Sequence, residues 1–255
     1  MTHRNPSANW GWLKLLCLTM MATLTIEHSR LDIYISGLFY TNGQWLLEKG
    51  GEPYALIFYN GPKLLLIVLA VYLMIVLTIK YRQPSRDIPS THPSQFDNWL
   101  NPLSVRETSY LLIVLIGVPT VIATLKAVTH VSCPNQLSLF NGELPYLNLW
   151  QDIISRTPVR CFPAAHASAG FALYGFAYLP RFKCYRVKII IAVSLLGWTM
   201  GLYKMAIGDH FFSHTLVSML LAWTQACATA TIIFAKRRIT KLTSLPTNIY
   251  KSVKK

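Results

Sequence analysis

Two short segments of the chain place histidine where it could act on a phosphoryl group. The first is CFPAAH, in which Pro163 ends a loop and two alanines lead into His166 at an expected helix start. A helix amino terminus offers free N–H groups and a favourable dipole to an anion, and small side chains let a phosphate approach that backbone closely. His166 could then protonate a leaving oxygen. Taken alone, His166 is also explained as an interfacial histidine beside a proline-initiated helix.

The second segment, YKMAIGDHFFSH, contains His210 and His214 four residues apart. Their side chains share one face if the helix is continuous, and a neutral imidazole can act as a nucleophile on phosphorus. Lys204 supplies a cation upstream, and Gly208 allows a turn between the two. A histidine pair at this spacing also suits a metal site. The pair alone therefore leaves metal binding, phosphoryl chemistry and polar packing open.

A third segment begins at Lys126, near the end of a long apolar run. A charge at the centre of a membrane helix costs roughly 2.5 to 3.5 kcal/mol, and less near the helix ends. Lys126 is thus either a phosphate-binding cation or a side chain that extends to the lipid headgroups.

Elements that cross a membrane must position these three segments. The chain is 53% hydrophobic and only 13% charged, which excludes an ordinary soluble domain of its length. Runs that suit about 30 Å of hydrocarbon lie at roughly 11–26, 62–79, 109–128, 165–179, 187–203 and 213–234. We therefore predict an all-α polytopic membrane protein in which six transmembrane helices form a bundle, with a single membrane domain over residues 1–255.

The first apolar run also resembles a signal peptide, because Lys14 precedes it. No small-residue cleavage site follows the run. Instead, the charged or polar residues Glu27, His28 and Arg30 come next. We therefore predict that the run is a retained membrane anchor.

The net charge of +14 would suit nucleic acid binding, but the positions of the charges argue against it. Most of the 24 Lys and Arg residues lie in the amino terminus, in residues 80–108 and 180–188, and in the tail 235–255. The six spans place these segments on one side, which the positive-inside rule makes cytoplasmic. We predict cytoplasmic termini, a basic cytoplasmic tail attracted to anionic lipid, and an extracytoplasmic (periplasmic) site in a bacterial inner membrane. The expected partner is the bilayer and not nucleic acid.

Two connections carry weaker signals. Residues 27–61 include LDIYISGLFY, whose alternation of apolar and polar residues suits an interfacial helix or a substrate-facing lip. Simple anchoring by its aromatic side chains explains the segment equally. Residues 80–108 contain several prolines among polar residues, which predicts an irregular cytoplasmic connection without catalytic content.

Taken together, the three segments resemble the type 2 phosphatidic acid phosphatase family. That family's signature is K-x6-R-P, then P-S-G-H, then S-R-x5-H-x3-D. The matching positions are Lys126 followed after six residues by Cys133-Pro134, then Pro163-Ala164-Ala165-His166, then Tyr203-Lys204 followed at the same spacing by His210 and His214. Order and spacing agree across roughly residues 60–234.

The resemblance implies a six-helix bundle with its active site at the outer membrane interface and with no metal or other cofactor. In that family's mechanism, His210 would attack phosphorus to give a phosphohistidine, while His166 protonates the leaving group and later activates water. Lys126 and Lys204 would hold the phosphate. Backbone N–H groups near Ala164 and Ala165 would be further donors that stabilise the transition state.

Two matched positions depart from the family in ways that bear on chemistry. Cys133 stands where the family has arginine, so one bidentate phosphate donor is missing; Arg156 or Arg160 in the same loop could replace it. His214 stands where the family has the aspartate that orients the nucleophilic imidazole. A neutral His214 can accept a hydrogen bond from His210, but a protonated one repels it. We therefore expect activity to fall below about pH 6.5, the unperturbed histidine value.

The milder departures keep charge or size. Lys204 replaces arginine and keeps the charge, and Ala164-Ala165 replaces Ser-Gly and keeps small side chains. Asp209 would point away from His210 on a helix and could pair with Lys204.

Cys133 and Cys161 lie in the same outer loop, and outside the cytoplasm they could form a disulfide. The bond would tie the first motif to the second. The alternative is two free thiols.

The predicted function is that of an integral membrane lipid phosphatase, which hydrolyses a phosphomonoester or diphosphate on a lipid headgroup. A lipid-to-lipid phosphotransferase of the same mechanism is the alternative if another lipid replaces water as acceptor. Because the arginine and aspartate are both replaced, a non-catalytic relative that binds lipid phosphate also stays open. The expected substrate is a lipid phosphate, and the sequence carries no signal for an oligomeric state.

Overall fold

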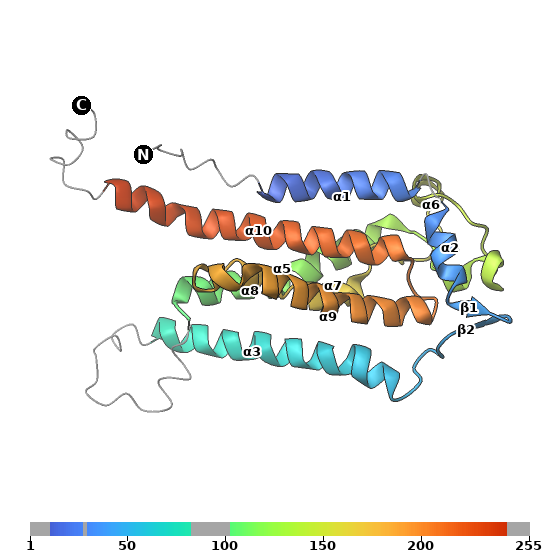
Figure 1. The fold of residues 1–255 in the computed structure, drawn as a ribbon, viewed down its shortest axis with the longest axis horizontal. Helices are drawn as coiled ribbons and strands as arrows, with labels where there is room; N and C mark the ends of the chain where they lie inside the picture. Colours follow the sequence, from blue (N-terminus) through green and yellow to red (C-terminus); the bar gives the residue numbers. More distant parts are fainter. Residues whose placement is uncertain (1–10, 28–29, 83–102, 244–255) are drawn as a thin grey trace.

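The computed structural model describes residues 11–27, 30–82 and 103–243 of the 255-residue chain. Long helices lie side by side along one direction (Figure 1). They are α1 (Gly11–Glu27), α3 (Gly61–Arg82), α5 (Val105–Thr129), α9 (Arg186–Ala206) and α10 (Phe212–Thr243). The expected all-α class is confirmed over these residues.

Among the residues that the structure describes, four helical stretches are long and apolar enough to cross a membrane. They are Leu56–Arg82, Val105–Gln136, Pro180–Ala206 and Phe212–Phe234, and each overlaps a predicted span. The α3 helix exposes many large apolar side chains along its length, including Leu64, Leu65 and Val68. Such a surface suits lipid rather than water, as expected of an integral membrane protein.

Six spans are not shown, because the first and fourth predicted runs differ from the other four. The α1 helix is shorter, with 17 residues. The fourth run divides into α7 (Ala165–Phe171) and α8 (Tyr174–Ala177). At the junction the Leu173 N–H donates to the Gly170 carbonyl oxygen at 3.2 Å, three residues back, which is a tighter turn than the α-helix makes.

The α7 and α8 helices form the centre of the bundle. Helix α7 contacts α3, α5, α9 and α10, and its small residues allow close packing. A Cβ added at Gly170 would lie 2.9 Å from the Met200 sulfur. Fully buried aromatic side chains such as Tyr110, Phe171 and Tyr174 fill the surrounding core. Irregular backbone is tolerated at membrane depth when protein covers it, so this broken element suits a central position.

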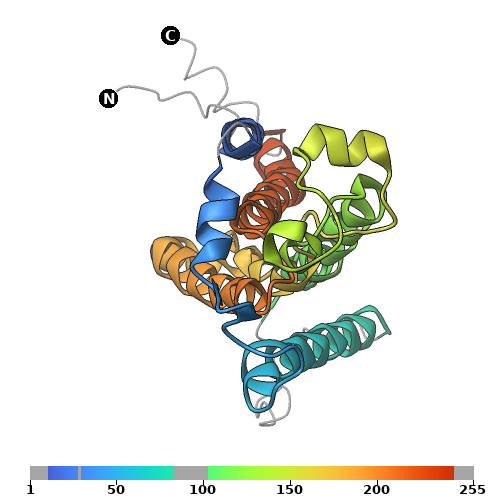
Figure 2. The ribbon, with the colours of Figure 1, turned by 90° about the vertical axis from the view of Figure 1, so that its right-hand side faces the viewer.

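One end of the bundle carries the short elements of the outer loops. In Figure 2, which views that end, α2 and the elements between α5 and α7 lie over the ends of the long helices. The elements are α2 (Leu31–Gly37), the hairpin β1 (Tyr40–Thr41) and β2 (Gln44–Trp45), the π-helical turn η1 (Leu56–Asn60), the 3₁₀ turns η3 (Pro134–Gln136) and η4 (Ser138–Phe140), and α6 (Leu149–Ser155). A further 3₁₀ turn, η5 (Pro180–Tyr185), precedes α9 at the other end.

Part of the chain on the predicted cytoplasmic side falls outside the described residues. This holds for most of the connection 80–108 and for the end of the tail 235–255. Where the end of the connection is described, Ser104 and Glu107 form a capping box at the start of α5. Glu107 also pairs with Arg181 at 2.9 Å.

Candidate active site

His166 and His210 face each other at the end of the bundle that carries the short elements. His166 lies in the first turn of α7, and His210 lies in the turn between α9 and α10. The Nδ1 atom of His166 is 3.4 Å from the Nε2 atom of His210. His210 is only 2% exposed, and burial together with positive neighbours holds its pKa well below its usual range. His210 is therefore neutral at pH 7, as a nucleophile on phosphorus must be.

Lys204 and Asp209 form an ion pair beside these histidines. The Lys204 Nζ atom, on the last turn of α9, donates to Asp209 Oδ2 at 3.0 Å. Asp209 Oδ1 accepts from Lys49 Nζ and from Asn135 Nδ2, each at 3.1 Å. Burial raises the pKa of Asp209, but hydrogen bonds and charges from Lys204 and Lys49 outweigh burial and lower it. Asp209 is thus a carboxylate shared by two lysines and an amide.

Lys126 approaches the same site from the last turn of α5. Its side chain is half-buried, and its charge acts on both His166 and His210. The Thr129 hydroxyl donates to the Phe162 carbonyl oxygen and so ties the end of α5 to the segment before α7. The three predicted segments therefore meet at one place.

Cys133 and Cys161 are joined by a disulfide, with their Cα atoms 5.3 Å apart. The Cys161 N–H also donates to the Val131 carbonyl oxygen at 2.8 Å. The bond connects the loop after α5 to the segment that leads into α7. Because both sulfurs are used in the bond, Cys133 offers no donor to a phosphate.

The two arginines considered as replacements lie on the surface. Arg156 ends α6 in the left-handed conformation, with φ 50°, and its side chain is exposed. Arg160 is exposed as well. Besides Lys204, the structure brings Lys49 to Asp209 from the connection between α1 and α3.

The backbone at the start of α7 supplies fewer free donors than the motif alone suggests. The Ala164 N–H donates to the His214 carbonyl oxygen at 3.1 Å. The N–H groups of Ala165 and His166 lie in the first turn of α7, where no helical acceptor precedes them. The small side chain of Ala165 keeps that backbone open to an anion.

His214 supports His210 less directly than the family's aspartate would. It lies in the first turn of α10, whereas His210 precedes that helix, and the two ring centroids are 5.7 Å apart. The Nδ1 atoms of both rings are buried and have no hydrogen-bond partner among the residues that the structure describes. The His210–His214 hydrogen bond considered from the sequence is therefore not formed in this structure.

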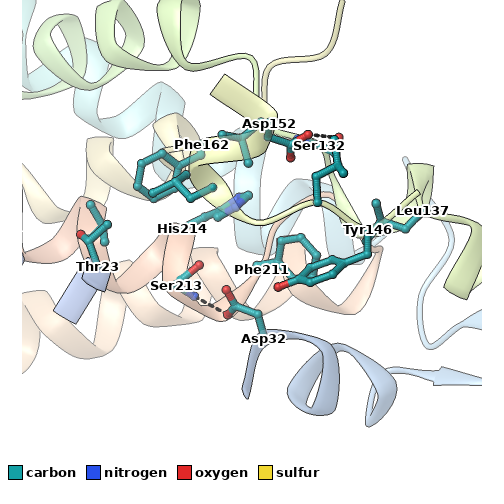
Figure 3. Close-up of a pocket in the computed structure, with 14 residues that line it drawn as sticks. Thr23, Asp32, Ser132, Leu137, Tyr146, Asp152, Phe162, Phe211, Ser213 and His214 are labelled. Atoms are coloured by element: carbon teal, nitrogen blue, oxygen red, sulfur yellow. Dashed lines mark hydrogen bonds between the residues drawn. The ribbon is translucent and has the colours of Figure 1, made fainter. Parts of the chain in front are cut away.

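A cavity of about 50 Å³ lies on another side of His214 (Figure 3). Two carboxylates line it, of which Asp152 is buried and Asp32 is partly buried. Asp32 of α2 accepts from the Ser213 N–H at 2.9 Å, and Asp152 of α6 accepts from the Ser132 N–H at 3.0 Å. Burial raises the pKa of both carboxyl groups. Apolar side chains such as Phe162 and Phe211 make up much of the remaining lining, and the space is large enough for water.

Tyr59, in the π-helical turn before α3, covers the site from the lipid-exposed helix. Its ring meets the His166 ring edge to face, with centroids 5.1 Å apart. The Lys204 Nζ atom lies 4.7 Å from the Tyr59 ring centroid, a cation–π contact. Neither Tyr59 nor Lys49 could be assigned to the site from the sequence, because nothing local relates their loop to the histidine motifs.

Metal binding was one sequence-based alternative for the histidine pair. Within the described ranges, no group of three or more His, Cys, Asp or Glu side chains is placed to hold a metal ion.

Comparison with known proteins agrees with the motif pattern. The PAP2 superfamily matches residues 107–238, which include Lys126, His166, Lys204, His210 and His214. Neither the curated proteins nor the solved structures include a match to the chain. Because the matched region covers more than half of the chain and contains the assembled histidine site, the protein belongs to the PAP2 superfamily.

Proposed function

We propose that the protein is an integral membrane phosphatase that hydrolyses a phosphomonoester or diphosphate on a lipid headgroup. The observation that carries the proposal is the 3.4 Å approach of His166 Nδ1 to His210 Nε2. The two nitrogens are close enough to act on one phosphoryl group, one as nucleophile and the other as acid. Lys126 and Lys204 lie beside them, as electrostatic stabilisation of phosphoryl transfer requires.

In the first step, His210 Nε2 attacks phosphorus and forms a P–N bond. The bond from phosphorus to the lipid oxygen breaks, and His166 donates a proton to that oxygen. In the second step, His166 takes a proton from water while the water oxygen attacks phosphorus. The P–N bond then breaks, inorganic phosphate leaves, and both histidines return to their starting states.

The position of the site relative to the apolar helices favours a lipid as the substrate. The site lies at the end of the bundle where the outer loops gather, next to the apolar surface of α3. A lipid headgroup reaches such a site without leaving the bilayer. We propose that the whole chain forms one membrane domain with cytoplasmic termini and that the site faces the periplasm of a bacterial inner membrane.

Phosphate release by the purified protein tests the proposal. Full-length protein in detergent would be given a panel of lipid monophosphates and diphosphates, and the products identified by mass spectrometry. We expect release from at least one lipid and a loss of roughly 10³-fold or more in His210→Ala, since removal of a nucleophile abolishes the covalent route.

His130→Asn serves as the matched control for that experiment. His130 follows the last residue of α5 and adopts the left-handed conformation, with φ 51°, which asparagine tolerates. The control should keep its activity. Equal activity of the unaltered protein and His210→Ala would overturn the enzymatic proposal.

A further inference from the structure

The phosphate site as defined by the motifs lacks one cation. Cys133 occupies the position of the family's arginine and is bonded to Cys161. The motifs then supply only Lys126 and Lys204, and Lys204 already pairs with Asp209 at 3.0 Å. Two lysines and one carboxylate leave about one net positive charge. A phosphomonoester carries about −1.5 to −2 at pH 7, so these residues alone do not balance it.

Lys49 supplies a further positive charge at this place. Its Nζ atom is 3.1 Å from Asp209 Oδ1, on the same carboxylate whose other oxygen binds Lys204. Lys49 is also close enough to Lys126 for its charge to act on that residue. With Lys49 included, three lysines and one carboxylate leave about two net positive charges. That value matches a phosphate dianion.

The fold holds the backbone near Lys49 against the site. The Leu47 N–H donates to the Ala206 carbonyl oxygen at the end of α9, at 3.2 Å. Two residues earlier, Trp45 packs on Gly208, where an added Cβ would lie 2.3 Å from the indole. Gly208 has φ +72°, so the turn and the close approach both require glycine. The outer loop is therefore attached to the segment that carries Asp209 and His210.

The Lys49 side chain itself stays free to move. It is 71% exposed, compared with 9% for Lys204. An exposed ion pair of this kind contributes little to stability, so the Asp209 contact leaves Lys49 available to a stronger anion. A phosphate at His210 would offer more negative charge and more acceptor oxygens than one carboxylate.

We propose that Lys49 is a phosphate-binding residue that takes the place of the missing arginine, with Asp209 holding it beside the site until a phosphate arrives. The inference rests on the proposed function, because it assumes that phosphate binds at His210. The inference adds Lys49, which lies outside all three motifs, to the residues that would contact the substrate. Lysine lacks the planar fork of arginine, so Lys49 would act as a single positive charge.

Binding of orthovanadate, a phosphate analogue, tests the inference without requiring turnover. Calorimetry on the full-length protein in detergent would compare the unaltered protein with Lys49→Ala, Lys49→Arg and Arg160→Ala. We expect Lys49→Ala to bind about tenfold more weakly, the lower end for a charged hydrogen bond at an exposed position. Lys49→Arg should restore the affinity. Arg160→Ala, the exposed cation of the neighbouring loop, should leave it unchanged.

The possible outcomes distinguish the role of Lys49 from the proposed phosphatase function. Lys204→Ala serves as the reference variant that must weaken binding. If it does so while Lys49→Ala binds as tightly as the unaltered protein, the role of Lys49 is wrong and the proposed function stands. A loss in Arg160→Ala with none in Lys49→Ala would assign the missing cation to the arginine. If the unaltered protein neither binds vanadate nor releases phosphate from any lipid, both proposals are overturned.

Discussion

The two sides of His210 differ in how completely their polar groups are paired. On the side that faces His166, the His210 Nε2 atom approaches that ring, and Asp209 binds Lys204 at 3.0 Å and Lys49 at 3.1 Å. On the opposite side, the Nδ1 atoms of His210 and His214 have no hydrogen-bond partner among the described residues. The comparison indicates that charges from several segments gather on the side of the proposed phosphate site, whereas ring contacts hold His210 on the opposite side.

The largest expected difference between the two sides concerns their histidines. His166→Ala should lower kcat by roughly 10²- to 10⁴-fold, because a positioned acid contributes about that much. His214→Asn should lower kcat by about tenfold or less, since no hydrogen bond from His214 to His210 is lost. Steady-state kinetics on the lipid identified by the panel would measure both. A loss in His214→Asn as large as that in His166→Ala would show that His214 is a direct support of the nucleophile.

The disulfide joins the loop after α5 to the segment before α7, and its removal should affect both stability and activity. Cys133 and Cys161 are 28 residues apart in sequence, so closing this loop should contribute about 3.6 kcal/mol to stability. The Cys133→Ser/Cys161→Ser variant should therefore unfold at a lower temperature and lose phosphate release. Thermal unfolding measures the first effect. Cys184→Ser, which removes an exposed free thiol, is the control and should unfold like the unaltered protein.

The pH dependence should follow the burial of His210. From the sequence alone, activity was expected to fall below about pH 6.5. Burial disfavours the charged imidazole, so the pKa of His210 lies well below its usual range, and the nucleophile stays neutral to lower pH. We expect the acidic limb of the kcat profile to lie below pH 6.5. A limb at pH 6.5 or above would contradict the burial argument.

The same burial predicts the direction of the change in stability with pH. Between the lowered folded pKa and the ordinary unfolded pKa, the unfolded state binds the proton and the folded state does not. The free energy of unfolding should therefore fall as the pH drops below about 6.5. Thermal unfolding of the unaltered protein and of His210→Gln across this range would measure it. The variant should lose less stability on acidification.

The smallest effect is expected at the cavity behind His214. Asp32 accepts from the Ser213 N–H in the first turn of α10 and so caps that helix from α2. Asp32→Ala should lower the free energy of unfolding by about 1 kcal/mol, as the loss of a helix cap does, while kcat changes little. Chemical denaturation and phosphate release would test the two parts. A large fall in kcat with little loss of stability would instead connect the cavity to catalysis.

Much of the fold could be predicted from the sequence because apolar runs are a local signal. The predicted spans 62–79, 109–128, 187–203 and 213–234 all lie within long apolar helices. The run 165–179 was expected to be one span, but the backbone tightens after Phe171 and divides it. That break depends on close packing against α9, where a Cβ at Gly170 would meet Met200. Hydropathy does not record such contacts.

The residues of the candidate site also fall into those that the sequence predicted and those that only the structure revealed. His166, His210, Lys126 and Lys204 were found by spacing alone, because each lies at a fixed position relative to a helix end. The pairing of Asp209 with Lys204 was also expected and is confirmed. Lys49 and Tyr59 come from a connection whose course is set by long-range contacts, so no local pattern indicated them. Lys49 is 160 residues from Asp209 along the chain.

By itself, the sequence determined the family, the long apolar helices and the order of the catalytic motifs, since these depend on local hydrophobicity and on fixed spacing along the chain. Only the tertiary structure brought Lys49 to Asp209. It alone also left the Nδ1 atoms of His210 and His214 without hydrogen-bond partners among the described residues. The physical reason is that the angstrom-scale positions of loop side chains depend on packing between distant segments, which no local pattern specifies.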